Sequence, residues 1–540
     1  MNLFTNKKMY LFAGTITVFL VILSLFLKFQ NMQTIAAAIL TEAKQSELEE
    51  QYKTSENMIY QLLFEGENVP FDQAKDTYYL PQTTDGNWLK EDSFTLESKG
   101  QKLYWCEDDY WDDLNAAIAD GHEFAFLVTE EEYIAKGKIV FTGLPMMTIE
   151  RIDELATDIY YCKMTAFDPF HNDAGLYEVT SGYGVFGLRG RTSKKFPKKG
   201  WSLDLLKENG DPYKVSLFGL RADDDWKLNA LYPDATKVRE KIGIEIWNEL
   251  AAQTDSPYDA GTNMEYFELI LENDYQGIYG AMEQLDYKQF SMDKTEDVIY
   301  KSYSWPREGH TDETTVGDSI EYCGHLIKTA DRDISRELWQ PLLEYVGVTG
   351  FKSEDLSYNS EKIFQYINEH MNMDNLLNCD LFIQLLYAYD NKYKNLYINA
   401  DIKEDGYTLW KVPWDLNYSF GDRYINKEED ALTCYNLEWA NEIMPEFMIT
   451  EMLLESGNRE FAEILNEKWE ELQETVFCLE NVQKIAETQM NLLISSGAFA
   501  RDEVRWPDGP HETSVEKILE FHDARLGFLD EHYGSYLNEN

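Results

Sequence analysis

The sequence predicts an α+β fold with a β-rich N-terminal half and a helix-rich C-terminal half, preceded by one transmembrane helix. Strand-like apolar runs dominate from Ile139 to Asp286, helical periodicity dominates from Ser335 onward, and an uncharged apolar run lies close to the N-terminus. Strands followed by helices are typical of the α+β class. With 44% hydrophobic and 14% aromatic residues, the chain of 540 residues has the composition of a globular protein.

The apolar run near the N-terminus, Tyr10–Leu27, contains no charged residue and follows Lys7 and Lys8. As a helix it would be about 27 Å long, close to the thickness of the hydrocarbon core of a bilayer. Lysines before such a segment favour an N-terminus inside the cell. We therefore expect a single-pass protein of the cell membrane with its main domain outside the cytoplasm. A cleaved signal peptide is the alternative, because Ala36–Ala38 offers small residues.

The segment that follows, Gln33–Phe64, has no proline and only residues compatible with a helix, which predicts a helical stalk. Short aromatic strands and turn residues from Glu65 to Lys138 then predict a small unit of mixed structure. The expected organisation is a cytoplasmic tail (1–8), a transmembrane anchor (9–28), a helical stalk (29–65), an accessory region (66–138) and a main domain (139–540).

The main domain is expected to begin with strands and to contain one early helix. Strand patterns occur in the segments YGVFGLRG, GWSLDLL, WKLNALY and YFELILENDYQGIYGAMEQLD. The helix is predicted from KVREKIGIEIWNELA, where Val238, Ile242, Ile246 and Leu250 recur every four residues and form one apolar stripe. Further helices are predicted from Ser335 and from Met444 to Leu537, separated by a hairpin.

The overall charge restricts the partners of the chain. The 98 acidic and 48 basic residues give a formal net charge of −50, which repels the phosphate backbone of a nucleic acid. We therefore expect no nucleic-acid partner. Such acidity suits divalent cations and basic protein segments, although a well-solvated surface is its commoner meaning.

Polar residues gather at the open end of the predicted hairpin. LYIN forms one strand, Asp405-Gly406 the turn and YTLWKV the returning strand, so that Asn395 and Asp415 flank the same end. Asp390, which ends an apolar helix, is delivered to the same place. This set suits phosphoryl transfer, in which one carboxylate positions the acceptor hydroxyl while an amide and a second carboxylate hold Mg²⁺. The D-x-x-x-x-N interval is also that of the protein-kinase catalytic loop. The alternative is that Asp390 and Asn395 only cap and turn the chain.

Several segments together resemble the spore coat protein H (CotH) family of atypical secreted kinases. The segments are DN-x-x-x-N-L-Y and W-x-x-PWDLNYSFG, LRGRTSKKFPKKGWSLDL, DWKLNALYPDATKVREKIGIEIWNEL, YQGIYGAMEQLD, RDEVRW and HDARLGFLDEHY. The resemblance extends from Ile139 to Tyr533, and Gly190–Ser193 departs from the usual asparagine-serine-serine pattern. It implies that residues 139–540 form a CotH kinase-like domain with an atypical protein-kinase-like fold.

The resemblance also implies roles at the hairpin. Asp390 would be the catalytic acid that orients the hydroxyl, and Asn395 and Asp415 would bind the metal. Asn417 stands where the family commonly has a second aspartate. An amide can still bind Mg²⁺ through its oxygen, but it brings less charge, so that metal affinity or activity would be reduced.

Other residues are candidates for binding the nucleotide. Lys198 and Lys199 precede a strand, and Lys199 shares strand parity with Trp201, which would direct it inward if the strand extended that far. Arg189 is a candidate for contacting phosphate. Arg239 is expected instead to brace its helix through a carboxylate.

Glu283, at the end of an apolar strand, is a candidate for lining the adenine edge or for pairing with the lysine. The expected activity is transfer of the ATP γ-phosphate, with Mg²⁺ or Mn²⁺, to protein hydroxyl groups, serine foremost. The partner would be a protein with an accessible Ser or Thr, a basic coat or surface protein being one candidate. The alternatives are a catalytically weak pseudokinase-like scaffold at the cell surface or in a spore coat, and a carbohydrate-active hydrolase with paired carboxylates.

Overall fold

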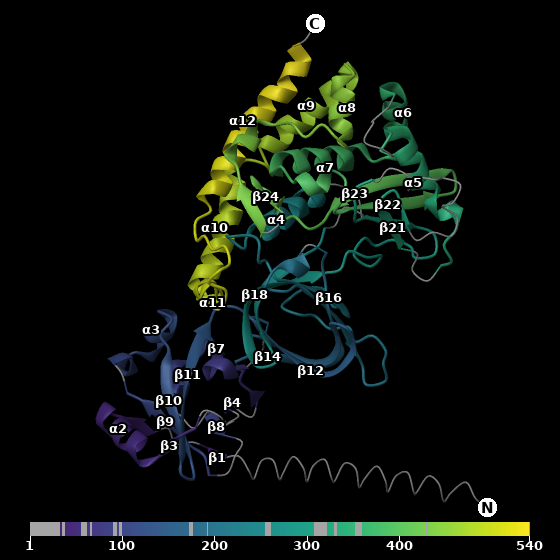
Figure 1. Cartoon of the computed structure of the whole chain (residues 1–540). Coiled ribbons are helices and arrows are strands. Elements are labelled where there is room, and N and C mark those ends of the chain that lie inside the picture. The colour runs from purple at the N-terminus through teal and green to yellow at the C-terminus, as the bar shows by residue number, and fades with distance from the viewer. Residues whose placement is uncertain are drawn as a thin grey trace, which may run out of the picture.

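The computed structural model shows a small N-terminal domain, a β-barrel and a helical half (Figure 1). The structure describes residues 33–34, 38–55, 62–64, 67–89, 94–96, 100–107, 109–171, 176–191, 193–253, 261–306, 321–328, 332–351, 359–427 and 430–538. The predicted transmembrane segment Tyr10–Leu27 lies outside these residues. Within them, no helix has the length and apolar character needed to cross a membrane.

The small N-terminal domain has its own aromatic core, which includes Trp105, Phe124 and Phe126. Its larger sheet contains, in spatial order, β2 (Ala38–Leu40), β9 (Lys102–Cys106), β10 (Phe124–Glu130), β11 (Tyr133–Thr142), β7 (Thr77–Pro81) and β6 (Phe71–Asp72). A second sheet contains β1 (Gln33–Thr34), β8 (Phe94–Leu96), β4 (Leu62–Phe64) and β5 (Glu67–Asn68), and α3 (Leu114–Ala119) packs beside them. Strand β11 carries this domain as far as Thr142, past the boundary expected at residue 139.

The prediction of a helical stalk over residues 29–65 is wrong for most of the described part of that segment. Only α2 (Glu42–Gln51) is helical, and β2 precedes it while β3 (Lys53–Thr54) follows it. Helix α2 buries none of its residues, so it has no apolar face that would dock it along another helix. Leu62–Phe64 forms β4 and is buried at every position. Consecutive apolar residues of this kind suit a strand that is covered on both faces better than an amphipathic helix.

The predicted strands of the main domain close into a barrel. In spatial order it consists of β12 (Met146–Ala156), β13 (Ile159–Asp168), β14 (Glu178–Leu188), β15 (Trp201–Leu206), β16 (Asp225–Asn229), β18 (Asp274–Glu283) and β17 (Met264–Leu271). Strand β15 shows the reason, because Trp201, Leu203 and Leu205 point inward while Asp204 is exposed. Alternation of this kind buries one face of each strand in the barrel core.

The predicted early helix is confirmed as α4 (Arg239–Ala252), between β16 and β17 in the chain. Val238, which precedes the helix, and Ile242, Ile246 and Leu250 are fully buried, as the apolar stripe predicts. They join the largest core of the molecule, which extends into the helical half. Helix α4 is therefore shared between the barrel and the helical half.

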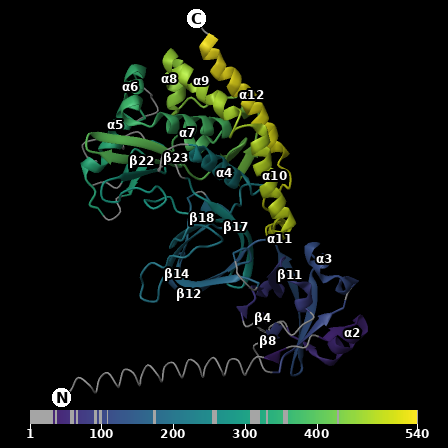
Figure 2. The same ribbon diagram turned by 180° about the vertical axis from the view of Figure 1, so that it is seen from behind.

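The C-terminal half is helix-rich, as predicted, and contains a five-stranded antiparallel sheet. The sheet consists of β20 (Glu321–Tyr322), β21 (His325–Lys328), β19 (Val298–Ser302), β22 (Leu396–Lys403) and β23 (Gly406–Pro413). The helices are α5 (Arg336–Thr349), α6 (Ser360–His370), α7 (Met373–Leu386), α8 (Ile449–Glu455), α9 (Arg459–Gln473), α10 (Leu479–Ser495), α11 (Ala498–Arg505) and α12 (Glu516–Asn538). A separate hairpin, β24 (Asp422–Lys427) and β25 (Asp430–Tyr435), follows β23. Figure 2 shows the barrel between the N-terminal domain and this half.

A buried ion pair fixes helix α11 to the barrel. The Lys198 ammonium lies 2.6 Å from the Asp502 carboxylate, and both side chains are almost completely buried. Lys198 also donates to the backbone carbonyl of Ile278 at 2.5 Å, while Asp502 accepts from the Ile278 N–H at 2.9 Å. His511 lies 3.2 Å from the same carboxylate. The positive charge of Lys198 lowers the pKa of Asp502 far below its usual value, against the opposing effect of burial.

A second buried carboxylate, Glu268 of β17, links three parts of the molecule. It accepts two hydrogen bonds of 2.8 Å from the Arg501 guanidinium of α11. It also accepts from the hydroxyls of Thr142, at the end of the N-terminal domain, and of Tyr275 in β18. The N-terminal domain, the barrel and helix α11 therefore meet at one carboxylate.

Replacement of Lys198 should destabilise the protein strongly, because it leaves the Asp502 carboxylate buried without its counter-ion. We expect Lys198→Met to lower the free energy of unfolding by about 3–5 kcal/mol. Urea titration of the full-length protein, followed by tryptophan fluorescence, measures this loss. Lys53→Met is the matched control, because Lys53 pairs with Glu132 at an exposed position, and it should cost less than about 1 kcal/mol. Equal losses for the two variants would contradict the interpretation, whereas Asp502→Asn added to Lys198→Met should recover part of the loss.

Candidate active site

The predicted hairpin that carries the site is present. Strand β22 pairs antiparallel with β23 from Leu396↔Pro413 at the open end to Lys403↔Gly406 at the turn. A buried ion pair of 2.6 Å between Lys411 of β23 and Asp380 of α7 holds the hairpin against the helix that precedes Asp390. The hairpin and the end of α7 are therefore placed together by a contact in the protein interior.

The open end of the hairpin is closed by the backbone and by one buried side chain. The N–H of Trp414 donates to the carbonyl of Asn395 at 2.9 Å. The amide of Asn391 donates to the carbonyls of Asn395 and Trp414 at 3.0 and 2.8 Å, so that one side chain holds both strand ends. Sequence reasoning missed this role of Asn391, although its position next to Asp390 in the quoted motif was a signal.

Asp390 lies in the short 3-10 turn Tyr389–Lys392 that follows α7. Its carboxylate pairs with the Lys394 ammonium at 2.5 Å, and about a quarter of each side chain is exposed. Asp390 is thus accessible from outside and has a cation beside it. Lys394 is a residue that sequence reasoning did not single out.

Asn395 and Asp415 both adopt left-handed backbone conformations, with φ of 57° and 64°. Asparagine and aspartate tolerate this region better than most residues, and residues held there tend to gather at functional sites. Burial raises the pKa of the Asp415 carboxyl, and the nearby charge of Asp390 raises it further, while Arg189, Lys301 and Lys394 oppose the shift. The structure therefore brings Asp390, Asn395 and Asp415 together at the hairpin end. Asn417 lies two residues further along the same loop and is half-buried.

Two cations lie near the ring of Trp414. The Arg189 guanidinium, at the end of β14, is 6.0 Å from the centre of the Trp414 ring. The Lys301 ammonium of β19 lies 5.7 Å from the same ring and 5.3 Å from that of Tyr397. Burial and the repulsion of Arg189 lower the pKa of Lys301 to about 8.

Neither of these cations has a carboxylate partner within ion-pair distance in the part of the chain that the structure describes. This is unexpected in a chain that has 98 acidic and 48 basic residues. Two partly buried cations next to each other repel, and an anion between them would relieve that repulsion. The arrangement suits the phosphates of a nucleotide. Lys301 was not found from the sequence, because nothing in VIYKS distinguishes it from a solvated strand lysine.

Glu240, in the first turn of α4, is a second carboxylate beside Asp415. It is 1% exposed, and neither of its carboxylate oxygens has a hydrogen-bond partner among the described residues. Burial raises the pKa of Glu240 well above its usual value, and the charge of Asp415 raises it further; Arg189 and the backbone amides of Leu416 and Asn417 oppose the shift. Sequence reasoning did not single out Glu240.

The structure does not bring Lys198 and Lys199 to this cluster. Lys198 is bound to Asp502, as described above. Lys199 donates to the carbonyls of Lys194 and Phe196 at 2.7 and 2.5 Å, within its own loop. Strand β15 begins only at Trp201, so strand parity does not extend back to Lys199. In this structure both lysines therefore have structural contacts.

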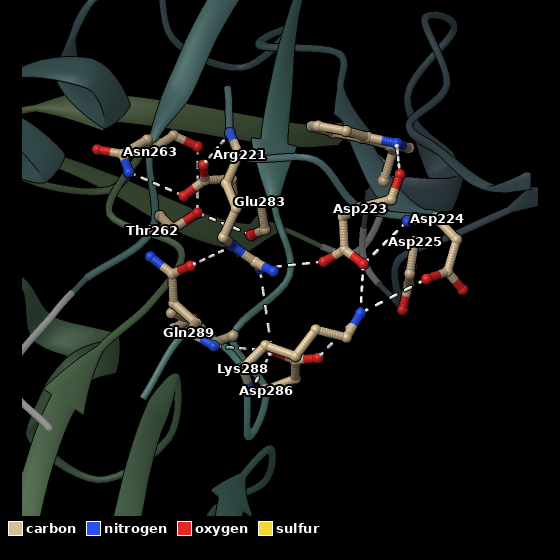
Figure 3. A network of polar contacts seen from close by, with 12 residues as sticks. Arg221, Asp223, Asp224, Asp225, Thr262, Asn263, Glu283, Asp286, Lys288 and Gln289 are labelled. Atoms are coloured by element: carbon tan, nitrogen blue, oxygen red, sulfur yellow. Dashed lines mark hydrogen bonds and ion pairs between the residues drawn. The ribbon is translucent and has the colours of Figure 1, made fainter. Parts of the chain in front are cut away.

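Glu283 belongs to a polar network at the connection between the barrel and the C-terminal half (Figure 3). Its carboxylate accepts from the N–H of Arg221 and from the amide of Asn263, both at 2.8 Å. Close by, the fully buried Asp223 carboxylate pairs with Arg221 at 3.0 Å and with Lys288. Glu283 therefore pairs with neither Lys198 nor Lys199 and instead holds the loop before β16 next to the end of β18.

Arg239 braces its helix, as expected. Its guanidinium lies 2.7 Å from Asp234, whose carboxylate also accepts from the Arg239 N–H at 2.8 Å. The same carboxylate accepts from the N–H and hydroxyl of Thr236. The guanidinium also lies 4.0 Å from Asp422 at the start of β24, so Arg239 links the turn before α4 to the segment that follows the site loop.

The donors at the hairpin end are all oxygens, which is the set that Mg²⁺ and Mn²⁺ prefer. No group of three or more His, Cys, Asp and Glu side chains arranged to hold a metal ion occurs among the described residues. Asp415 with the amides Asn395 and Asn417 is therefore a partial set. Such a set fits Mg²⁺, which is commonly bound by one or two carboxylates and completed by water and substrate phosphates.

Comparison with known protein families supports the resemblance noted in the sequence. The family model described as CotH kinase protein matches residues 186–529, about two thirds of the chain. The match includes Arg189, Glu240, Lys301, Asp390 and Asp415. No curated protein matches the chain. From the length of the family match, the chain belongs to the CotH kinase protein family.

Proposed function

We propose that this protein is an ATP-dependent protein kinase that transfers the γ-phosphate of ATP to a protein hydroxyl group, serine foremost. The observation that carries the proposal is the convergence of Asp390, Asn395 and Asp415 at the end of the hairpin, next to the unpaired cations Arg189 and Lys301. Membership in the CotH kinase family supports it. The family match alone does not identify the substrate.

Asp390 is proposed to accept and orient the acceptor hydroxyl. It is partly exposed, at the end of a buried helix and on a turn that Asn391 fixes, so its position is well defined. Its partner Lys394 lies 2.5 Å from the carboxylate and is proposed to contact the phosphate that is transferred. Precise positioning of this kind contributes much of the catalysis in phosphoryl transfer.

The nucleotide phosphates are proposed to bind between Arg189 and Lys301. Arg189 comes from the barrel and Lys301 from the C-terminal sheet, so a triphosphate placed there touches both halves of the domain. A Mg²⁺ or Mn²⁺ ion held by Asp415 and Asn395, with Asn417 as a further amide, would neutralise charge on the phosphates. Together these residues would set the γ-phosphate next to Asp390.

The location and the substrate follow from the sequence rather than from the site. We propose that Tyr10–Leu27 anchors the protein in the cell membrane with the kinase domain outside the cytoplasm. The net charge of −50 favours a basic protein substrate with an accessible Ser or Thr. A surface or coat protein would meet both requirements.

A catalytically weak scaffold remains the second candidate, and two observations favour it. Asn417 brings no charge to the loop where an acid would strengthen metal binding, and Lys394 occupies the Asp390 carboxylate. Both would slow turnover without disturbing the fold. A scaffold would bind nucleotide without transferring phosphate.

Asp390→Ala should lower phosphate transfer by about 100-fold or more while leaving ATP affinity nearly unchanged, because Asp390 orients the hydroxyl and does not hold ATP. Asp415→Ala should weaken Mg²⁺-dependent ATP binding by about tenfold or more as well as abolishing turnover. Autophosphorylation of the full-length protein with labelled ATP, together with calorimetric titration, measures both quantities. If both variants transfer phosphate at the parent rate, the site assignment is wrong.

Arg189→Met and Lys301→Met should each weaken ATP binding by about tenfold or more, because each removes a charge-assisted contact to phosphate. Lys403→Met is the matched control, since Lys403 lies on the neighbouring strand β22 and its side chain is 57% exposed. Titration with ATP and with adenosine separates a loss of phosphate contacts from a general defect. Unchanged ATP affinity in both variants would rule out this placement of the phosphates.

Asn417→Asp should raise both metal affinity and phosphate transfer if the missing charge limits the parent protein. The measurement is the dependence of autophosphorylation on Mg²⁺ concentration, with Asn426→Asp, a change of the same kind outside the site loop, as the control. A parent that binds ATP but transfers no phosphate, together with an Asn417→Asp variant that does transfer it, would identify the natural protein as a scaffold.

A further inference from the structure

Glu240 is a buried carboxylate without an ion-pair partner among the residues that the structure describes, although the backbone amides of Leu416 and Asn417 lie close enough to favour its charged form. A charged carboxylate that is 1% exposed loses its hydration and normally regains the energy from an ion pair or from hydrogen bonds. Neither carboxylate oxygen of Glu240 has such a bond among the described residues. The first turn of a helix favours a negative charge there, but that effect is far smaller than the cost of burial.

Glu240 lines a small cavity next to the proposed metal loop, together with apolar residues of α4 and of that loop. The cavity has a volume of about 10 Å³, room for roughly one water molecule or one small cation. Asp415, Trp414 and Thr262 line it together with Glu240. Two carboxylates thus border one small space between α4 and the loop after β23.

The cations that flank Glu240 in the sequence are already bound elsewhere. Arg239 pairs with Asp234 at 2.7 Å. Lys241 lies 3.1 Å from Glu265 and donates to the carbonyl of Met264. Arg189 is near enough to favour the charged form of Glu240, but it lies outside ion-pair distance and is directed over Trp414. The described residues therefore supply no cation within ion-pair distance of Glu240, and a cation bound there would stabilise its charged form.

We infer that Glu240 is a carboxylate ligand of the divalent cation, so that the ion links helix α4 to the loop of Asp415. This inference rests on the proposed function and deepens it. With Asp415, Glu240 gives the site two carboxylates, and it supplies the charge that Asn417 lacks. The two carboxylates and the amide of Asn395 provide three protein ligands, which leaves positions for water and phosphate.

A cation bound by Glu240 and Asp415 would also have a structural role. Helix α4 lies in the chain between β16 and β17 of the barrel, whereas Asp415 follows β23 of the C-terminal sheet. A cation bound to both carboxylates would hold the two halves together at the site. Binding of the cation would also remove the electrostatic repulsion between Glu240 and Asp415.

The test is direct measurement of Mn²⁺ binding to the full-length protein by electron paramagnetic resonance, without nucleotide. Glu240→Gln, which keeps the size of the side chain, should weaken Mn²⁺ binding by about tenfold or more. It should also raise or preserve the melting temperature of the metal-free protein, because it removes an unpaired buried charge. Glu245→Gln on the same helix is the matched control, since Glu245 contacts Lys241 and Gln489 instead of the cavity.

Three results distinguish the possibilities. Weaker Mn²⁺ binding in Glu240→Gln and Asp415→Asn, but not in Glu245→Gln, supports the inference. Parent-like binding in Glu240→Gln with weaker binding in Asp415→Asn overturns the inference and leaves the proposed function intact. A parent protein that binds no Mn²⁺, with or without ATP, overturns both.

Discussion

The buried ion pair between Lys198 and Asp502 is the contact on which the placement of the barrel against the helical half depends. It joins residues 304 positions apart, and the same carboxylate receives the backbone N–H of Ile278 in β18. Gly277 shows how closely the two parts approach: a Cβ atom there would lie 2.1 Å from the Asp502 carboxylate, and its φ of +86° also favours glycine. Lys198 lies in the same connection between β14 and β15 as Arg189, so the pair also helps to fix the segment whose first residue reaches Trp414.

The part of the site that could be predicted from the sequence is the part made by neighbours along the chain. The hairpin turn at Asp405-Gly406 sets the register of β22 and β23, and this register alone brings Asn395 and Asp415 to the same end. Asp390 follows because it lies in the short turn between α7 and the first strand of the hairpin. The apolar face of α4 could likewise be predicted from the sequence, because apolar residues spaced four apart lie on one face of a helix.

The remaining site residues could not be predicted, because long-range packing places them. Glu240 and Lys301 are ordinary charged residues in a helix and a strand. The packing of α4 against the loop after β23 sets Glu240 beside Asp415, and the pairing of β19 with β22 sets Lys301 near Trp414. The predicted inward orientation of Lys199 was wrong for a local reason. The strand begins two residues later, so the alternation of side chains along it does not determine where Lys199 points. The stalk prediction failed because helix-compatible residues also form strands when a sheet covers them, as Leu62–Phe64 shows.

The Glu268 contacts determine how a mechanical load passes through the molecule. The N-terminal domain, which would sit between a membrane anchor and the kinase domain, ends at Thr142, and Thr142 contacts the same carboxylate as Arg501 of α11. A pull on the N-terminal domain is therefore shared between the short connection Gly143–Pro145 and a buried charged contact that leads into the C-terminal helices. Helix α11 also carries Asp502, so a load that enters it through Arg501 is shared with the Lys198–Asp502 pair and returns to the barrel through that second buried contact.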